Sequence, residues 1–412
     1  MRRSDLIIIG AGPGGYRAAE FAAKQGLQVV IVEQDEVGGT CLNRGCIPTK
    51  TYVHSATFTE AFERQQSVVH QLRAGVEQLM SAPGITLLRG KASFVDAHTV
   101  SVCNESITAK NIIVATGSKA KIPVPLQAEH DPRVVTSTEL LQMATLPKQL
   151  CIIGAGVIGM EFASVFQRFG SEVTVIEFLK ECLPMVDSDV AKRLRKLMEK
   201  RGINFRMKTA VESLGDINAD VILIATGRQP YTDGLNLKAA GIEADPRGAI
   251  IVDDDFQTSS AGVYAIGDVN GRQLLAHAAE MQALHVVNLI LGRTDSIRFD
   301  VMPAAIFTEP EAACVGMSED QLKAQGVSYH CGKAFYRANG KALAMGQTDG
   351  MVKLLSDADG LIIGCHAFGS HAADMVQEVS VLMCRNTNVE QLRNMVHIHP
   401  TLGEILLDAA NY

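Results

Sequence analysis

The chain lacks the features that mark three large classes of protein. It has no excess of positive charge, because 38 Lys and Arg face 45 Asp and Glu, so nucleic acid is not an expected partner. It has no run of about 18 apolar residues, so we expect no membrane span. Its nine cysteines are odd in number and spread over 412 residues, unlike those of a disulfide-stapled secreted scaffold. A reducing compartment, the cytoplasm, is therefore predicted.

What is present is a globular composition and an internal repeat. Hydrophobic residues make up 47% and charged residues 20% of the chain, and its length suits two to four domains. Two short apolar runs, at 6–9 and 150–153, each lead into a G-x-G-x-x-G fingerprint and then a helical pattern. The fingerprint glycines are Gly10, Gly12 and Gly15 in the first copy, and Gly154, Gly156 and Gly159 in the second.

An acid follows each fingerprint at the same distance. Glu33 and Glu177 close a second strand-like run, each 23 residues after the first glycine. Another β-rich run ends in Ala-Thr-Gly in each half, at 115–117 and 225–227. The glycines allow a tight turn, close approach of a pyrophosphate and close helix packing, and the acid can bond a ribose hydroxyl. We therefore predict an α/β fold with two tandem Rossmann-like dinucleotide-binding domains, followed by an α+β domain from about Arg298.

Two cysteines stand close together in Gly38-Gly-Thr-Cys41-Leu-Asn-Arg-Gly-Cys46-Ile-Pro-Thr-Lys50. Residues five apart in a regular helix point about 140° away from each other, so these two could bond only across an irregular turn, which Gly45 permits. Pro48 suits the first turn of a helix, whose dipole would favour a Cys46 thiolate. Two reduced core cysteines, or a metal site without further close ligands, are the alternatives. The other seven cysteines are predicted to be core residues.

A histidine near the C-terminus is a candidate base. His399 precedes Pro400, which favours an extended backbone at His399, and Pro400 can open a helix that carries Glu404. A carboxylate bonded to one ring nitrogen would leave the other nitrogen to accept a thiol proton. A single histidine is more often structural, but this spacing favours a catalytic role. His397 is left without a role.

These motifs resemble those of the flavoprotein disulfide reductase family, and within it the lipoamide dehydrogenases, from Asp5 to Glu404. The resemblance implies that Cys41 exchanges with a dithiol substrate and that Cys46 faces the flavin. It also implies an ion pair between Lys50 and Glu161 close to the flavin, and a base, His399, supported by Glu404. In this family the base acts across a two-fold interface, so a homodimer is expected.

The resemblance also assigns the cofactors and the domains. It implies FAD at the first fingerprint and NAD at the second, where Glu177 would bond a 2′-OH and repel the 2′-phosphate of NADP. The implied division is 1–147 for FAD, 148–261 for NAD, 262–297 as a return segment of the FAD domain, and 298–412 for dimerisation. Further cofactor positions implied are Gly39, Thr40, Lys50, Ala92, Ala115, Thr116, Gly117, Val211, Gly227, Asp268, Leu275, Ala276 and His277.

The implied activity is oxidation of dihydrolipoamide to lipoamide with reduction of NAD+. The expected partner is a lipoyl-bearing carrier domain of a 2-oxo acid dehydrogenase complex or of the glycine cleavage system. The alternatives are a related reductase of glutathione or another small disulfide, and a non-catalytic flavin-binding protein. Two departures from the family stand out. Arg44 occupies a position that is apolar in many members, and the chain looks shorter after Lys50 and between Asn204 and Asp220.

Overall fold

The computed structural model describes residues 2–123, 126 and 131–411. The prolines at 123, 125 and 147 predict a linker into the second repeat, and Pro125 lies outside the described residues. The chain forms two compact units, each built from several segments. The first comprises Met1–Lys121, Ser137–Ala144 and Gly227–Ile297, and the second comprises Ile122–Thr136, Thr145–Thr226 and Arg298–Tyr412.

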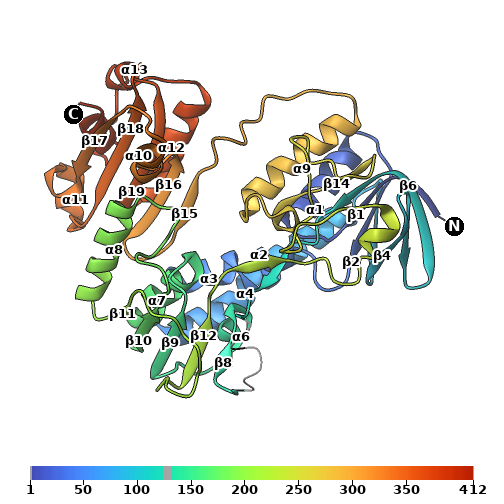
Figure 1. Ribbon diagram of the computed structural model, residues 1–412, viewed down its shortest axis with the longest axis horizontal. Helices are drawn as coiled ribbons and strands as arrows, with labels where there is room; N and C mark the ends of the chain where they lie inside the picture. Colours follow the sequence, from blue (N-terminus) through green and yellow to red (C-terminus); the bar gives the residue numbers. More distant parts are fainter. Residues whose placement is uncertain (1, 124–125, 127–130, 412) are drawn as a thin grey trace. The chain divides into compact units, whose positions relative to one another are not determined.

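A seven-stranded sheet forms the centre of the first unit (Figure 1). Its parallel strands follow the order β3-β2-β1-β6-β14, which corresponds to half of a dinucleotide-binding fold. Two antiparallel strands, β5 and β4, continue the sheet beyond β6. The strands are β1 (Arg2–Ile9), β2 (Val29–Glu33), β3 (Ile85–Arg89), β4 (Ala92–Asp96), β5 (Thr99–Val102), β6 (Glu105–Val114) and β14 (Val263–Ala265).

Helices α1 and α9 of the first unit lie against each other (Figure 1). Pro13 occupies the first position of α1, where its missing N–H costs nothing. Among the described residues, no helix is both long and apolar enough to cross a membrane. The helices of this unit are α1 (Pro13–Lys24), α2 (Gly39–Arg44), α3 (Cys46–Val53), α4 (Phe58–Met80), α6 (Ser137–Gln142) and α9 (Ala276–Ile290), with short 3-10 helices η1 (Leu237–Ala240) and η2 (Gly267–Asn270).

The second unit begins with another parallel sheet, in the order β11-β10-β9-β12-β8. Its edge strand β8 lies within the stretch that we expected to be a linker. Between Arg206 and Val221 the described chain forms no strand. The elements are β8 (Val134–Val135), β9 (Gln149–Ile153), β10 (Glu172–Ile176), β11 (Asn204–Arg206), β12 (Val221–Ile224), α7 (Val157–Phe169) and α8 (Ser188–Lys200).

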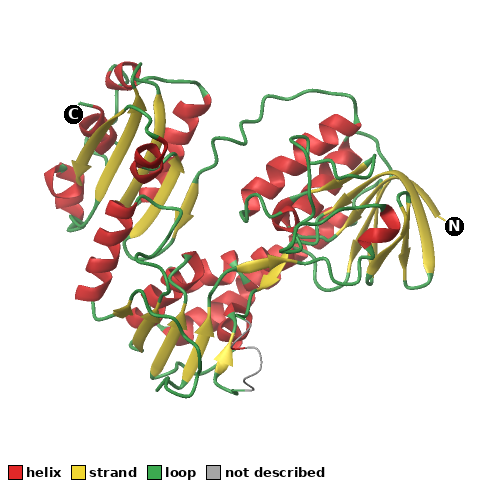
Figure 2. Cartoon of the chain, viewed as in Figure 1, coloured by secondary structure: helices red, strands yellow, loops and turns green. Residues whose placement is uncertain are grey.

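The C-terminal part of the second unit is an antiparallel sheet in the order β15-β16-β19-β18-β17, with helices packed on it (Figure 2). Helices α12 and α14 cover an apolar core in this sheet, so the predicted α+β fold is confirmed. Its elements are β15 (Ala304–Ile306), β16 (Glu311–Gly316), α10 (Glu319–Gln325), β17 (Tyr329–Phe335), η3 (Tyr336–Ala338), α11 (Gly340–Met345), β18 (Met351–Asp357), β19 (Ile362–Gly369), α12 (Ala372–Cys384), α13 (Val389–Arg393) and α14 (Glu404–Ala410).

A buried ion cluster ties helix α8 to the C-terminal sheet. The Lys353 ammonium lies 2.7 Å from Asp187 and 2.5 Å from Glu319, and the side chains of Lys353 and Asp187 are each 1% exposed. Burial of Glu319 opposes its ionisation, but hydrogen bonds from Lys323, Lys353 and Tyr329 outweigh burial and hold its pKa at about 2. The Glu319 carboxylate is therefore a charged partner of the buried ammonium at neutral pH.

The two compact units divide the chain differently from the four predicted ranges. Residues 227–261, which we assigned to the NAD domain, group with the first unit. One reason is that β13 (Arg228–Pro230) pairs with β7 (Ser118–Ala120). Another is that Ile242 and Ile250 enter the same apolar core as strand β1. The four-part division remains a proposal.

Candidate active site

The outer glycines of both fingerprints have nearly identical surroundings. Gly10 has φ +102° and Gly154 has φ +107°, and a Cβ on either would lie 2.4 Å from the carbonyl oxygen of the alanine in the following Ala-Thr-Gly run. A Cβ on Gly15 or Gly159 would lie 1.8 or 1.9 Å from the carbonyl oxygen of the first glycine. Only glycine fits these four positions.

The middle glycines leave the starts of two helices open. Gly12 caps α1 with φ −74° and ψ −174°, and Gly156 caps α7 with φ −76° and ψ −173°. Neither glycine makes a side-chain cap. A Cβ on Gly156 would meet nothing within 4 Å, and one on Gly12 would lie 3.9 Å from Gly39. The N–H groups of both helix starts can therefore receive a pyrophosphate.

The two acids hold their loops in the same way. Glu33 accepts hydrogen bonds from the backbone of Ala11 at 2.7 Å and of Asp35 at 2.8 Å. Glu177 accepts from Ala155 at 2.6 Å and from the backbone of Leu179, two residues on, at 2.7 Å. Both carboxylates are thus fixed at the edge of a glycine turn, where a ribose hydroxyl would lie. The residues present therefore fit two dinucleotides.

The other positions implied for FAD lie in the first unit. Thr116 donates a hydrogen bond to the carbonyl of Tyr231 at 2.7 Å. Leu275 caps α9, so that Ala276 and His277 begin that helix. The remaining positions are Gly39 and Thr40 at the start of α2, Lys50 in α3, Ala92 in β4, Ala115 and Gly117 after β6, and Asp268 in η2.

Sequence reasoning missed two partners of Asp268. Ser118 donates to the Asp268 carboxylate at 2.5 Å, and Arg228 donates to the Ser118 hydroxyl at 2.7 Å and to its carbonyl at 2.6 Å. Burial lowers the pKa of Arg228, although the nearby Asp268 charge opposes this shift. No spacing in the sequence could reveal this cluster, because pairing of β7 with β13 brings it together.

The structure brings Cys41 and Cys46 together. Helix α2 ends at Arg44, the next residue, Gly45, has a non-helical φ of −141° and ψ of −113°, and α3 begins at Cys46. Cys41 is half-buried and Cys46 is exposed. A hydrogen bond with Cys46, helped by burial, raises the pKa of the Cys41 thiol far above its usual value, while the Lys50 charge opposes this. The irregular turn predicted between the two sulfurs is present.

The prediction that the other seven cysteines are core residues is partly wrong. Cys103 and Cys384 are exposed and Cys331 is half-buried, whereas the remaining four are buried. Cys103 lies in the turn between β5 and β6 with φ +48°, and Cys384 ends α12, and both places face solvent. Within the described ranges, no group of three or more His, Cys, Asp or Glu is arranged to hold a metal ion.

One ring nitrogen of His399 is paired with the Glu404 carboxylate, as predicted, but the helix that carries Glu404 does not begin at Pro400. The His399 Nδ1 lies 2.9 Å from Glu404 Oε1, and Glu404 Oε2 accepts from the Thr401 backbone at 2.9 Å. These hydrogen bonds, first from Thr401 and then from His399, lower the pKa of Glu404. Helix α14 begins at Glu404 and not at Pro400, because a bend at residues 399–400 and a turn at residues 402–403 precede it. The His399 side chain is 79% exposed.

The other implied positions fall in different units. Lys50 belongs to the first unit and Glu161 to the second, so their ion pair remains a prediction. Glu161 is 3% exposed and accepts a hydrogen bond from the Phe307 backbone at 2.9 Å. Val211 packs on the apolar core of the second unit's parallel sheet. Gly227, with φ +104°, opens the segment that returns to the first unit.

Two dinucleotide-binding folds with a pair of contacting thiols define a class of redox enzyme that joins thiol chemistry to nucleotide cofactors. The chain belongs to the pyridine nucleotide-disulphide oxidoreductase family, whose model matches residues 4–283 and whose dimerisation domain matches residues 302–410.

Several known proteins are similar to this chain over nearly their whole length. The mitochondrial dihydrolipoyl dehydrogenase of Pisum sativum is 35% identical, over 99% of this chain and 91% of the relative. The dihydrolipoyl dehydrogenase of Chlamydia muridarum is 35% identical, over 98% and 96%. The structure of the HOCl-induced flavoprotein disulfide reductase RclA from Escherichia coli has a TM-score of 0.92 at 32% identity, covering 99% of both chains. The plant alignment spans 455 positions, so that relative carries residues that this shorter chain lacks.

Proposed function

We propose that this protein is an FAD-dependent dihydrolipoyl dehydrogenase, which oxidises dihydrolipoamide to lipoamide and reduces NAD+. The observation that carries the proposal is the contact between the Cys41 and Cys46 thiols at the start of α3, in the same unit as the first fingerprint. Two thiols in contact can form the disulfide that a dithiol substrate reduces. The relatives named dihydrolipoyl dehydrogenase support the choice of substrate.

The chain's own residues account for the thiol chemistry. His399, oriented by Glu404, takes a proton from one substrate thiol, and the thiolate attacks Cys41 of the Cys41–Cys46 disulfide. Cys46 leaves as a thiolate, which the start of helix α3 stabilises. The second substrate thiol then displaces Cys41, so that the substrate leaves as a disulfide and the cysteine pair is reduced. Bound FAD supplies a two-electron acceptor for the reduced pair and a hydride donor for NAD+.

The two nucleotides are assigned by position and charge. FAD belongs to the first fingerprint, because a flavin that exchanges electrons with the cysteine pair must lie next to it and both cysteines are in the first unit. NAD then belongs to the second fingerprint. The Glu177 carboxylate, held beside Ala155 at 2.6 Å, would repel a 2′-phosphate, which supports NAD over NADP.

A homodimer is the expected assembly, since the C-terminal part matches a dimerisation domain. His399 is flanked by apolar side chains that face solvent: Val396 is 99% exposed and Ile398 is 79% exposed. Such a patch suits coverage by a second chain, and we propose that His399 of one subunit serves Cys41 of the other. The proposed partner is a lipoyl-bearing carrier domain, and the proposed compartment is the cytoplasm.

One alternative has support of its own. The similarity to RclA, over the full length of both chains, keeps open a related disulfide reductase that acts on another small disulfide. Initial rates measured with lipoamide or oxidised glutathione, each with NADH or NADPH, distinguish the dihydrolipoyl dehydrogenase from the alternative reductase. A dihydrolipoyl dehydrogenase turns over lipoamide with NADH, and higher rates with another pair would favour the alternative.

The direct test is NADH formation from dihydrolipoamide and NAD+ by the purified flavoprotein. Cys46→Ser should abolish it, because Ser cannot form the disulfide. The matched control is Cys103→Ser, which changes an exposed cysteine in a turn and should leave the rate unchanged. Turnover that survives Cys46→Ser would refute the role of the cysteine pair.

A further inference from the structure

The helix that carries Cys41 is short and depends on its surroundings. Helix α2 has six residues, follows Gly38 without a side-chain cap, and stops where Gly45 breaks the helical conformation. A helix of this length is not stable on its own, so outside contacts fix its orientation. Because Cys41 lies in α2 and Cys46 begins α3, that orientation sets how the two sulfurs face each other.

Asn43, two residues after Cys41, makes three hydrogen bonds with its half-buried side chain. Its Nδ2 donates to the carbonyl oxygens of Val37 and Gly39, both at 2.9 Å. Its Oδ1 accepts from the Nε of Arg73 at 2.8 Å. The first two bonds tie the helix to the turn that precedes it, and the third ties it to helix α4.

Both parts that Asn43 joins are themselves fixed. The backbone of Gly38 in the preceding turn donates to the Ala11 carbonyl oxygen at 2.8 Å, which attaches this turn to the first glycine fingerprint. Arg73 lies on the 23-residue helix α4, and its guanidinium is 3.8 Å from the Glu36 carboxylate. Asn43 therefore links the helix of the reactive cysteine to two rigid elements of the first unit.

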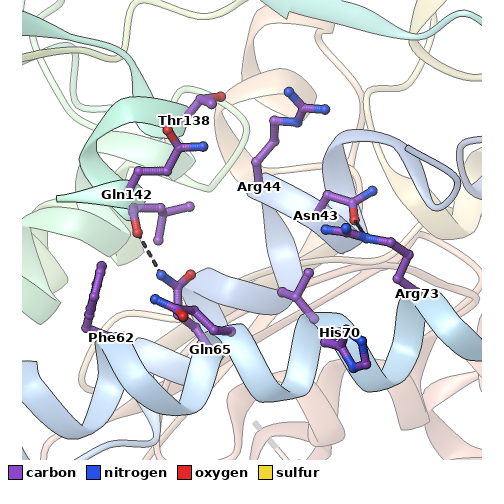
Figure 3. A pocket seen from close by; sticks show the side chains of 11 residues that line it. Asn43, Arg44, Phe62, Gln65, His70, Arg73, Thr138 and Gln142 are labelled. Carbon is purple, nitrogen blue, oxygen red and sulfur yellow. Dashed lines mark hydrogen bonds between the residues drawn. The ribbon is translucent and has the colours of Figure 1, made fainter. Parts of the chain in front are cut away.

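The bond between Arg73 and Asn43 borders open space. A cavity of about 340 Å³ lies between helices α2, α4 and α6, and Asn43, Arg44 and Arg73 are among the residues that line it. Figure 3 shows Arg73 turned towards Asn43 across one side of this cavity. Because the neighbouring space is open, a substitution of Arg73 removes the bond without disturbing a close-packed core.

We propose that Asn43, held by Arg73, is a positioning residue for the redox pair, and that it keeps the Cys41 sulfur where it can close a disulfide with Cys46. This inference rests on the proposed function, because it takes the Cys41–Cys46 disulfide as the redox group. Two sulfurs that are held in place react as if at high effective concentration, which favours the disulfide over the dithiol. Loosening helix α2 should therefore make the disulfide easier to reduce.

The test measures the midpoint of reduction of the purified flavoprotein in mixtures of reduced and oxidised dithiothreitol. The reagent gives two electrons and two protons to the two cysteine sulfurs and closes its own disulfide, and alkylation with mass spectrometry counts the thiols formed. Asn43→Ala removes all three bonds but keeps a good helix former, and Arg73→Met removes the bond from α4. Each should lower the equilibrium constant for forming the disulfide by about tenfold, a shift of about 30 mV for a two-electron couple.

Two further variants separate positioning from a general structural effect. Glu36→Gln removes the charge beside Arg73 but leaves the bond to Asn43, so this matched control should keep the wild-type midpoint. The double variant Asn43→Ala with Arg73→Met should shift no further than Asn43→Ala alone, because Arg73 acts through Asn43. If Asn43→Ala loses its flavin, the shift in Arg73→Met against the Glu36→Gln control tests the inference.

The outcomes for this inference and for the proposed function are distinct. A wild-type midpoint in yellow, folded Asn43→Ala and Arg73→Met variants overturns the positioning role, even if the wild type oxidises dihydrolipoamide. A double variant shifted by the sum of the single shifts, or an equal shift in Glu36→Gln, also overturns it. If the wild type forms no disulfide between Cys41 and Cys46, the proposed function fails together with the inference.

Discussion

Replacing single glycines of the second fingerprint by alanine should separate nucleotide binding from folding. A methyl group on Gly156 would enter open space in front of helix α7, with nothing within 4 Å. The same group on Gly159 would lie 1.9 Å from the Gly154 carbonyl oxygen, and this backbone atom cannot move away without disturbing the glycine turn. The two substitutions add the same atom three residues apart, so they form a matched pair.

The expected changes in stability differ in size. Gly156 has φ −76° and ψ −173°, which alanine adopts freely. Gly156→Ala stiffens the unfolded chain, which raises the free energy of unfolding, and weakens the helix cap, which lowers it, so the net change should stay within about 0.5 kcal/mol. Gly159→Ala should cost about 1–3 kcal/mol, as overpacking against rigid neighbours usually does. Gly156→Ala should weaken NAD binding by roughly tenfold or more, because its methyl group occupies the approach of the pyrophosphate.

Three measurements on each variant check this reasoning. Urea denaturation gives the free energy of unfolding, NADH fluorescence gives the affinity for the nucleotide, and the visible spectrum gives the flavin content. Gly156→Ala should be stable and yellow but bind NADH poorly, and Gly12→Ala should instead lose flavin. If Gly156→Ala binds NADH as wild type does, or loses flavin, the assignment of the second fingerprint to NAD is refuted.

Three further predictions concern the second unit. Glu404→Gln removes the carboxylate that orients the His399 ring at 2.9 Å, so kcat with dihydrolipoamide should fall by at least about tenfold, and an unchanged kcat would exclude the pair as the base. Lys353→Met leaves the buried Asp187 carboxylate unpaired and should cost about 3–5 kcal/mol in urea denaturation, whereas a stable variant would contradict the ion cluster. The pKa of Glu319 is depressed to about 2, so ionised Glu319 adds about 3 kcal/mol to the free energy of unfolding above pH ~5, and this contribution is lost as pH falls towards 2. The loss of stability over this pH range should be absent in Glu319→Gln, and its persistence in that variant would assign it to another group.

Features fixed by neighbouring residues could be predicted from the sequence. Each glycine turn depends on contacts within a few residues of the chain and on one contact with the alanine carbonyl of the following Ala-Thr-Gly run. Because the two fingerprints match in sequence, the two turns have the same conformation. The same holds for the contact between Cys41 and Cys46, since Gly45 alone breaks the helix between them.

Features that depend on distant packing could not be predicted. The return of residues 227–261 to the first unit rests on a strand pair more than one hundred residues apart, as Ser118 and Pro230 show. The cavity beside Arg44 requires three helices from separate segments. The start of α14 at Glu404 depends on a hydrogen bond from Thr401 that the Pro400 signal does not contain.

The most direct test of the redox pair is a count of thiols in the denatured protein before and after reduction by one equivalent of NADH, with the new thiols mapped by mass spectrometry. The account predicts that the oxidised flavoprotein gains two thiols, both located at Cys41 and Cys46. No gain, or a gain at any other cysteines, would contradict it.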